Sequence, residues 1–90
     1  MKWIHAINDY KDYLKIERGL SDNSIISYEN DLKKLESFLT NKSQFTDPLA
    51  VKPDQIKEFV YHISKEVKAN SQSRIISGIR SFYDYLLFEK

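Results

Sequence analysis

Two short polar stretches hold the residues of this sequence that could do chemistry. The first combines an amide, two hydroxyls and a phenol in Asn23, Ser24, Ser27 and Tyr28. Such side chains can cap the start of a helix. Together with free backbone N–H groups and the positive end of the helix dipole, they can instead bind an anion such as phosphate. Capping is the more frequent role, and both interpretations remain open from the residues alone.

The second stretch places arginines among small polar residues. It contains Ser73, Arg74, Ser77, Arg80 and Ser81. Along the chain, no acidic residue interrupts this surface before Asp84, and the segment 65–80 has four basic residues against one acidic residue. Arginine and serine side chains donate hydrogen bonds to phosphate oxygens. We therefore expect this surface to face phosphate groups.

No catalytic constellation can be assembled from the sequence. There is no cysteine, and the two glycines are too few for a glycine-rich phosphate loop. His5 and His62 have no metal-ligand or catalytic partner at a suitable spacing. The six tyrosines are spaced as core or half-buried aromatic residues would be. The chain is therefore expected not to be an enzyme by itself, and to bind neither a metal nor a cofactor.

The size and composition predict one small globular domain. The chain has 90 residues, of which 41% are hydrophobic and 30% are charged, and its net charge is only +1. Its apolar runs are too short for a membrane span, and its first residues lack the apolar segment of a signal peptide. A cytoplasmic, membrane-free protein is expected. A nucleic-acid partner would require the basic residues to gather on one face.

The apolar residues recur at helical spacing and predict four helices. We expect helices over about 2–18 and 22–40, a third from Pro53 through Val67, and a fourth that follows a cap at Asn70 or Ser71 and extends to about Phe88. The expected buried stripes are Ile4, Ile7, Tyr10 and Leu14; Ile25, Tyr28, Leu32, Leu35 and Leu39; Ile56, Phe59, Val60, Ile63 and Val67; and Ile75, Ile79, Phe82 and Leu86. The residues expected beside these stripes are Trp3, Tyr13, Ile26, Phe38, Ile76, Tyr83 and Leu87. No strand signal is present, so the fold class is all-α.

The connections between these helices have turn residues of their own. Gly19 can adopt the left-handed conformation that ends a helix, and Ser21, Asp22 and Asn23 each have a side-chain oxygen that can cap the next one. Residues 41–52 break the helical pattern, and Leu49 and Val51 are expected to pack back onto the core. A coiled coil is less consistent with the second helix, because its heptad pattern ends after about two repeats.

Two segments resemble a known family. Asp-Tyr-Leu-Lys-Ile-Glu-Arg-Gly-Leu-Ser-Asp-Asn-Ser-Ile-Ile-Ser-Tyr-Glu-Asn-Asp-Leu (12–32) and Ser-Arg-Ile-Ile-Ser-Gly-Ile-Arg-Ser-Phe-Tyr-Asp-Tyr-Leu (73–86) look like the N-terminal core-binding domain of Xer-type tyrosine recombinases, in the phage-integrase family. The resemblance covers nearly the whole chain. It implies a compact four-helix, SAM-like bundle that forms one half of a C-shaped clamp around duplex DNA, with the second and fourth helices facing the major groove.

The resemblance also implies which residues approach DNA. The residues at these positions are Asn23, Ser24, Ser27 and Tyr28 of the second helix and Arg74, Ser77 and Arg80 of the fourth. Ser73, from the polar stretch described above, completes the expected DNA-binding set. In two places the sequence departs from the family, with serine at 24 in place of threonine and Gly78 in place of alanine. In a helix, Gly78 costs up to about 1 kcal/mol.

The family's catalytic residues belong to a second domain, so none is transferred to this chain. Residues 1–90 are expected to be a single core-binding domain of a site-specific recombinase. Its expected partners are double-stranded DNA, a catalytic domain in the full-length protein and further copies assembled on DNA. The alternative is a small helical protein–protein interaction domain, in which the serine and arginine cluster is only solvated surface.

Overall fold

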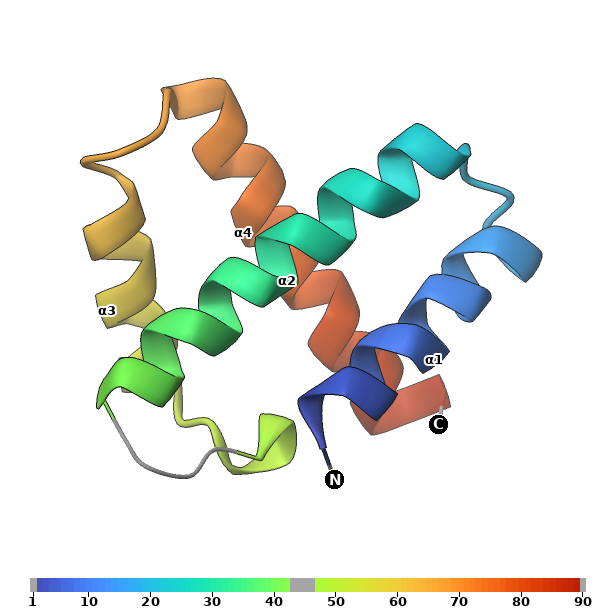
Figure 1. The fold of residues 1–90 in the computed structure, drawn as a ribbon, viewed down its shortest axis with the longest axis horizontal. Coiled ribbons are helices and arrows are strands. Elements are labelled where there is room, and N and C mark those ends of the chain that lie inside the picture. The colour runs from blue at the N-terminus through green and yellow to red at the C-terminus, as the bar shows by residue number, and fades with distance from the viewer. Residues whose placement is uncertain (1, 43–46, 90) are drawn as a thin grey trace.

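The computed structural model describes residues 2–42 and 47–89, and the regular elements within them are all helical. The helices are α1 (Trp3–Ile16), α2 (Asp22–Lys42), α3 (Pro53–Ile63) and α4 (Ala69–Asp84) (Figure 1). The 3₁₀ turn η1 (Pro48–Ala50) precedes α3, and the π-helical turn η2 (Tyr85–Glu89) follows α4. The predicted all-α fold with four helices is confirmed. Residues 43–46, which belong to the predicted break before the third helix, lie outside the described residues.

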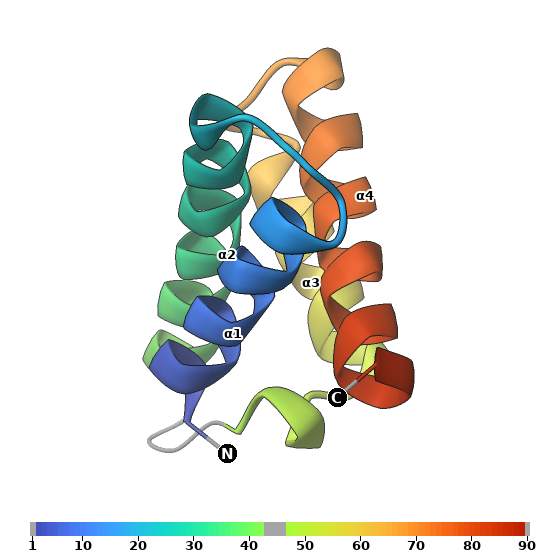
Figure 2. The same cartoon turned by 90° about the vertical axis from the view of Figure 1, so that its right-hand side faces the viewer.

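Helix α2 is the central element of the bundle. It contacts α1, α3 and α4, and it crosses in front of α4 in Figure 1. Figure 2 shows α1 and α2 in one layer and α3 and α4 in the other. The N-terminal ends of α2 and α4 lie at the same end of the bundle in both views. The two polar stretches of the sequence are therefore brought to one end of the molecule and to the crossing below it.

All four helices contribute to one hydrophobic core. Its buried members are Trp3, Ala6, Ile7, Tyr10, Leu14, Ile25, Leu32, Leu35, Leu39, Phe59, Ile63, Ile75, Ile79, Phe82 and Leu86. The predictions were wrong for Ile4, Ile26 and Leu87, which are 62%, 51% and 64% exposed. On α1 the buried face begins at Trp3 and continues at Ile7. Because successive helical residues point about 100° apart, Ile4 faces away from the core.

The turn between α1 and α2 forms as the sequence predicts. Gly19 has a φ of 63°, in the left-handed region that glycine adopts without a steric penalty. The backbone N–H of Leu20 donates to the carbonyl of Leu14 at 3.1 Å, which satisfies one free carbonyl at the end of α1. Helix α2 then begins at Asp22, so Ser21 occupies the cap position.

The boundary between α3 and α4 differs from the prediction. Helix α3 ends at Ile63 instead of continuing to Val67, and α4 already begins at Ala69. The cap residue of α4 is Lys68, without a side-chain capping bond, so the prediction of a cap at Asn70 or Ser71 is wrong. Backbone bonds close the short connection instead, as when the N–H groups of Glu66 and Val67 both donate to the Ile63 carbonyl.

The segment before α3 covers one end of the core only in part. Pro48 is buried and Val51 is half-buried against the core, whereas Leu49 is 51% exposed, contrary to prediction. Pro53 occupies the first turn of α3, as expected, and the Gln55 side chain accepts a hydrogen bond from the Lys52 N–H at 2.9 Å. Within residues 2–42 and 47–89, no helix is both long and apolar enough to cross a membrane.

Candidate nucleic-acid interface

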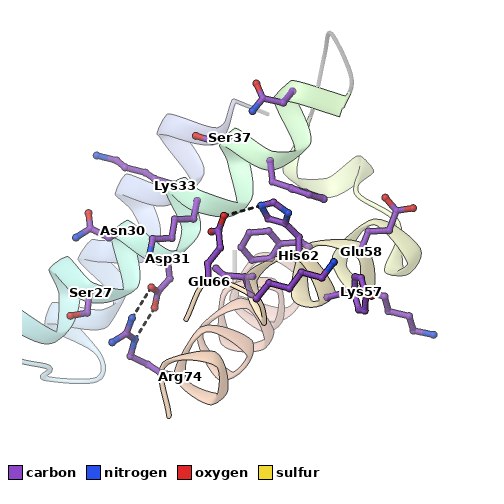
Figure 3. A pocket seen from close by; sticks show the side chains of 17 residues that line it. Ser27, Asn30, Asp31, Lys33, Ser37, Lys57, Glu58, His62, Glu66 and Arg74 are labelled. Carbon is purple, nitrogen blue, oxygen red and sulfur yellow. Dashed lines mark hydrogen bonds and ion pairs between the residues drawn. The ribbon is translucent and has the colours of Figure 1, made fainter. Parts of the chain in front are cut away.

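Arg74 of α4 is held by a carboxylate from α2. Its Nε–H donates to Oδ2 of Asp31 and its Nη2–H donates to Oδ1, each at 3.0 Å (Figure 3). The Asp31 side chain is 2% exposed, whereas the Arg74 side chain is 44% exposed. Hydrogen bonding to Asp31, followed by the negative charge of that carboxylate, raises the pKa of Arg74. The guanidinium is therefore cationic, fixed on its inner side and open to solvent on its outer side.

Asp31 was not among the predicted site residues, although the sequence contains a signal for it. Asp31 lies three residues after Tyr28 and four before Leu35, so it falls beside the apolar stripe of its helix. A carboxylate at such a position requires a cationic partner. The predicted surface was expected to have no acidic residue before Asp84. This holds along α4 itself, but the carboxylate that faces Arg74 comes from α2.

The start of α2 shows which of its serines cap the helix. The backbone N–H of Ser24 donates to Oγ of Ser21 at 3.3 Å, which is a capping bond, and the Ser21 hydroxyl donates to Oγ of Ser24 at 3.1 Å. Ser24 is half-buried and Asn23 is exposed. Capping thus accounts for Ser21 and engages Ser24, while the side chain of Asn23 faces solvent.

Helix α4 presents its predicted polar residues to solvent. Ser73, Arg74, Ser77 and Arg80 are all exposed. Ser81, which was expected on the same surface, is half-buried and accepts a hydrogen bond from the Tyr10 hydroxyl at 2.9 Å. Ser81 therefore joins α4 to α1, and we refer to the four exposed predicted residues as the α4 strip.

A groove of about 1380 Å³ is lined by α2 and α3 and extends to Arg74 of α4. Ser27 and Arg74 line one part of it, and Figure 3 shows the bidentate pair there. Five cationic side chains and three carboxylates line the groove, namely Lys33, Lys34, Lys57, Lys65 and Arg74 with Asp31, Glu58 and Glu66. Its walls therefore have more positive than negative charge, which favours an anionic ligand.

A second hollow, of about 590 Å³, lies between α1 and α4. Tyr28, Ser77 and Arg80 line it together with Arg18 and Asp84. The predicted residues are thus divided between two hollows, because Ser27 and Arg74 belong to the groove beside α3. Ser73, Asn23 and Ser24 line neither hollow.

The described residues contain no group of three His, Cys, Asp or Glu side chains that could hold a metal ion. His62 is exposed, and a carboxylate lies four residues after it in the sequence. Its Nε2 is 3.5 Å from Oε1 of Glu66, and its ring centroid is 5.1 Å from that of Phe38. This pair is open to solvent on the wall of the α2–α3 groove.

Comparisons with known proteins point to one family. The family model described as "Phage integrase, N-terminal SAM-like domain" matches residues 7–90. Tyrosine recombinase XerD of Listeria monocytogenes serotype 4b (strain F2365) is 37% identical over 84 residues, which cover 92% of this chain and 28% of that protein. The protein of the same name from Oceanobacillus iheyensis is 34% identical over 87 residues, covering 96% of this chain and 29% of that protein.

Tyrosine recombinase XerD of Staphylococcus epidermidis (strain ATCC 35984) is 38% identical over 86 residues, covering 93% of this chain and 28% of that protein. The chain thus spans less than a third of the length of these curated relatives. No solved structure matches the chain.

Proposed function

Because the chain belongs to the phage integrase N-terminal SAM-like domain family, we propose that it binds duplex DNA through α2 and α4 as part of a site-specific recombinase. The proposed contacts are Asn23, Ser24, Ser27, Tyr28, Ser73, Arg74, Ser77 and Arg80. The observation that carries the proposal is the exposed polar strip of α4, in which two arginines and two serines face solvent. These side chains donate hydrogen bonds, and phosphate and base-edge oxygens accept them.

The length of the relatives supports a proposal about which part of a recombinase this chain forms. Proteins named tyrosine recombinase match this chain over only 28–29% of their length. We propose that residues 1–90 form one non-catalytic, DNA-binding domain and that the reaction belongs to a separate catalytic domain. DNA, that catalytic domain and further copies of the recombinase on DNA are the proposed partners, and the cytoplasm is the proposed location.

The charge of the chain sets the expected strength of binding. With a net charge of +1, the chain as a whole attracts DNA only weakly. Binding by this domain must depend on local contacts to a few phosphates, each of which releases counterions. We therefore expect weak affinity that falls steeply as salt is raised.

A titration of the chain into labelled duplex DNA at about 50 mM and about 200 mM salt tests the proposal. Anisotropy should report binding that weakens at the higher salt. The variant Arg74→Ala/Arg80→Ala should lose most of this binding, measured at a temperature at which circular dichroism shows it to be folded. Lys2→Ala/Lys15→Ala removes the same charge from exposed positions outside both hollows and is the matched control.

Two results would contradict the proposal. Equal weakening by both double variants would mean that only net charge matters and that the α4 strip is not the contact surface. The absence of any binding by the unmodified chain at low salt would favour the alternative of a small helical protein–protein interaction domain.

A further inference from the structure

Asp31 is the one charged side chain that is buried among the residues that the structure describes. A carboxylate in such a position loses its hydration, and only a well-aligned cation compensates for that loss. Ion pairs of this kind are frequently no more stabilising than apolar residues of similar volume. A contribution to stability is therefore only a weak explanation for the presence of a bidentate ion pair between α2 and α4.

The geometry of the pair suggests a second role. Asp31 engages the Nε–H of Arg74 and one Nη2–H, which are two of the five N–H donors of a guanidinium. The other three, two on Nη1 and one on Nη2, remain for a ligand. The guanidinium is planar, and its two hydrogen bonds to Asp31 hold that plane in one orientation. The remaining N–H donors therefore also point in fixed directions.

A hydroxyl side chain of α2 lines the same groove as this guanidinium (Figure 3). Ser27 lies one helical turn before Asp31 on α2, and both residues line the α2–α3 groove with Arg74. Ser77 lies one turn after Arg74 on α4 but lines the hollow between α1 and α4 instead. A tetrahedral oxyanion at the open edge would therefore meet an oriented cation in a groove that the Ser27 hydroxyl also lines.

We propose that Asp31 is a positioning residue, which orients Arg74 of α4 so that the free edge of its guanidinium donates to a phosphate of duplex DNA. This inference rests on the proposed function and deepens it. Asp31 itself does not touch DNA, and its own charge repels phosphate. If Asp31 acts by orienting Arg74, neutralising Asp31 should weaken DNA binding. If only net charge matters, the same change should strengthen it.

The variant Asp31→Asn uses this opposition. An asparagine keeps the shape of the side chain but accepts through one oxygen only, so the bidentate pair is lost. We expect Asp31→Asn to weaken binding to duplex DNA on the order of tenfold, although the variant adds one positive charge. The slope of log affinity against log salt should become shallower by about one, as for the loss of one phosphate contact.

Glu29→Gln is the matched control. Glu29 lies on the same helix, is largely covered, and pairs with Lys11 and Lys33 at 3.2 and 3.3 Å. Its neutralisation changes the net charge by the same amount and leaves Arg74 untouched, so binding should be unchanged or tighter. The double variant Asp31→Asn/Arg74→Ala should bind no more weakly than Arg74→Ala.

Arg74→Lys provides a test that keeps the buried carboxylate and the positive charge. Lysine cannot form the planar, two-pronged pair, so the variant should lose most of the affinity that Arg74→Ala loses. Binding is compared at temperatures at which circular dichroism shows each variant to be folded. If Asp31→Asn fails to fold, Arg74→Lys alone decides.

The outcomes are separable. Tighter binding by Asp31→Asn, to the same extent as by Glu29→Gln, would overturn the positioning role and leave DNA binding standing. An affinity of Arg74→Lys for DNA equal to that of the unmodified chain would also overturn the positioning role. If neither the unmodified chain nor Glu29→Gln binds duplex DNA at low salt, the proposed function itself is wrong and the role of Asp31 falls with it.

Discussion

Tyr28 of α2 occupies the space that a side chain at position 78 of α4 would need. A Cβ added to Gly78 would lie 2.9 Å from Cδ1 and 3.2 Å from Cε1 of the Tyr28 ring. Both distances are shorter than the separation of about 3.5–4.0 Å at which carbon atoms pack best. The glycine that looked like a cost to helix propensity therefore allows α2 and α4 to cross closely.

Gly78→Ala should consequently have opposite effects in two backgrounds. In the unmodified chain, overpacking against Tyr28 should outweigh the gain in helix propensity and lower the free energy of unfolding by about 1 kcal/mol. In the Tyr28→Ala background the same change should raise it by about 1 kcal/mol. Urea denaturation of the four proteins measures both effects. An equal effect in both backgrounds would show that the ring moves aside at no cost.

Removal of the cap at the start of α2 should destabilise the fold. Ser21→Ala takes away the oxygen that accepts the Ser24 N–H and should lower the free energy of unfolding by about 1 kcal/mol. Ser73→Ala, at an exposed position near the start of α4, is the control and should change it by less than about 0.5 kcal/mol. Equal melting temperatures for the two variants would argue against a capping role for Ser21.

Removing the hydroxyl of Tyr83 and removing that of Tyr10 should change the stability of the fold in opposite directions. The Tyr83 hydroxyl is buried without a hydrogen-bond partner among the described residues, so Tyr83→Phe should raise the free energy of unfolding by up to about 1 kcal/mol. The Tyr10 hydroxyl donates to Ser81, so Tyr10→Phe should lower it by about 1 kcal/mol. Urea denaturation at pH 7 decides, and a loss in both variants would contradict the assignment.

Tyr83 should also make the stability of the fold depend on pH in the alkaline range. Burial, and then the charge of Asp47, raise the pKa of Tyr83 above its ordinary value. As the pH rises, the Tyr83 hydroxyl ionises in the unfolded chain before it does so in the folded chain, and this favours unfolding. The free energy of unfolding is therefore unaffected by Tyr83 ionisation below about pH 10 and falls as the pH rises beyond it. The free energy of unfolding should therefore fall less between about pH 9 and pH 11 in Tyr83→Phe than in the unmodified chain. Parallel profiles would contradict this.

Glu29 should contribute stability that disappears in acid. Burial raises the pKa of its carboxyl, but hydrogen bonds from Lys11 and Lys33 outweigh that effect and lower the pKa overall. The contribution is therefore present above the unfolded pKa of about 4.3 and is lost as the pH falls below it. Because Lys33 is largely exposed, we expect less than about 1 kcal/mol. Melting curves between about pH 3 and pH 6 should show a smaller acid loss in Glu29→Gln.

The local features of the chain were predictable because each depends on residues close together in sequence. Gly19 marks a helix end, the polar residues 21–23 mark a helix start, and apolar spacing identified most of the core. The errors on the apolar face of α1 arose where neighbouring positions compete for the same interior. Trp3 is buried and Ile4 is exposed because the packing of α1 against the other helices selects one of two overlapping stripes.

By itself, the sequence determined an all-α domain of four helices, its family resemblance and the exposed strip of α4. Only the tertiary structure decided that Asp31 pairs with Arg74, 43 residues away, and that Tyr28 packs on Gly78. Helical periodicity specifies which face of a helix is apolar. It does not specify where two helices cross, and that crossing determines which side chains from separate helices meet.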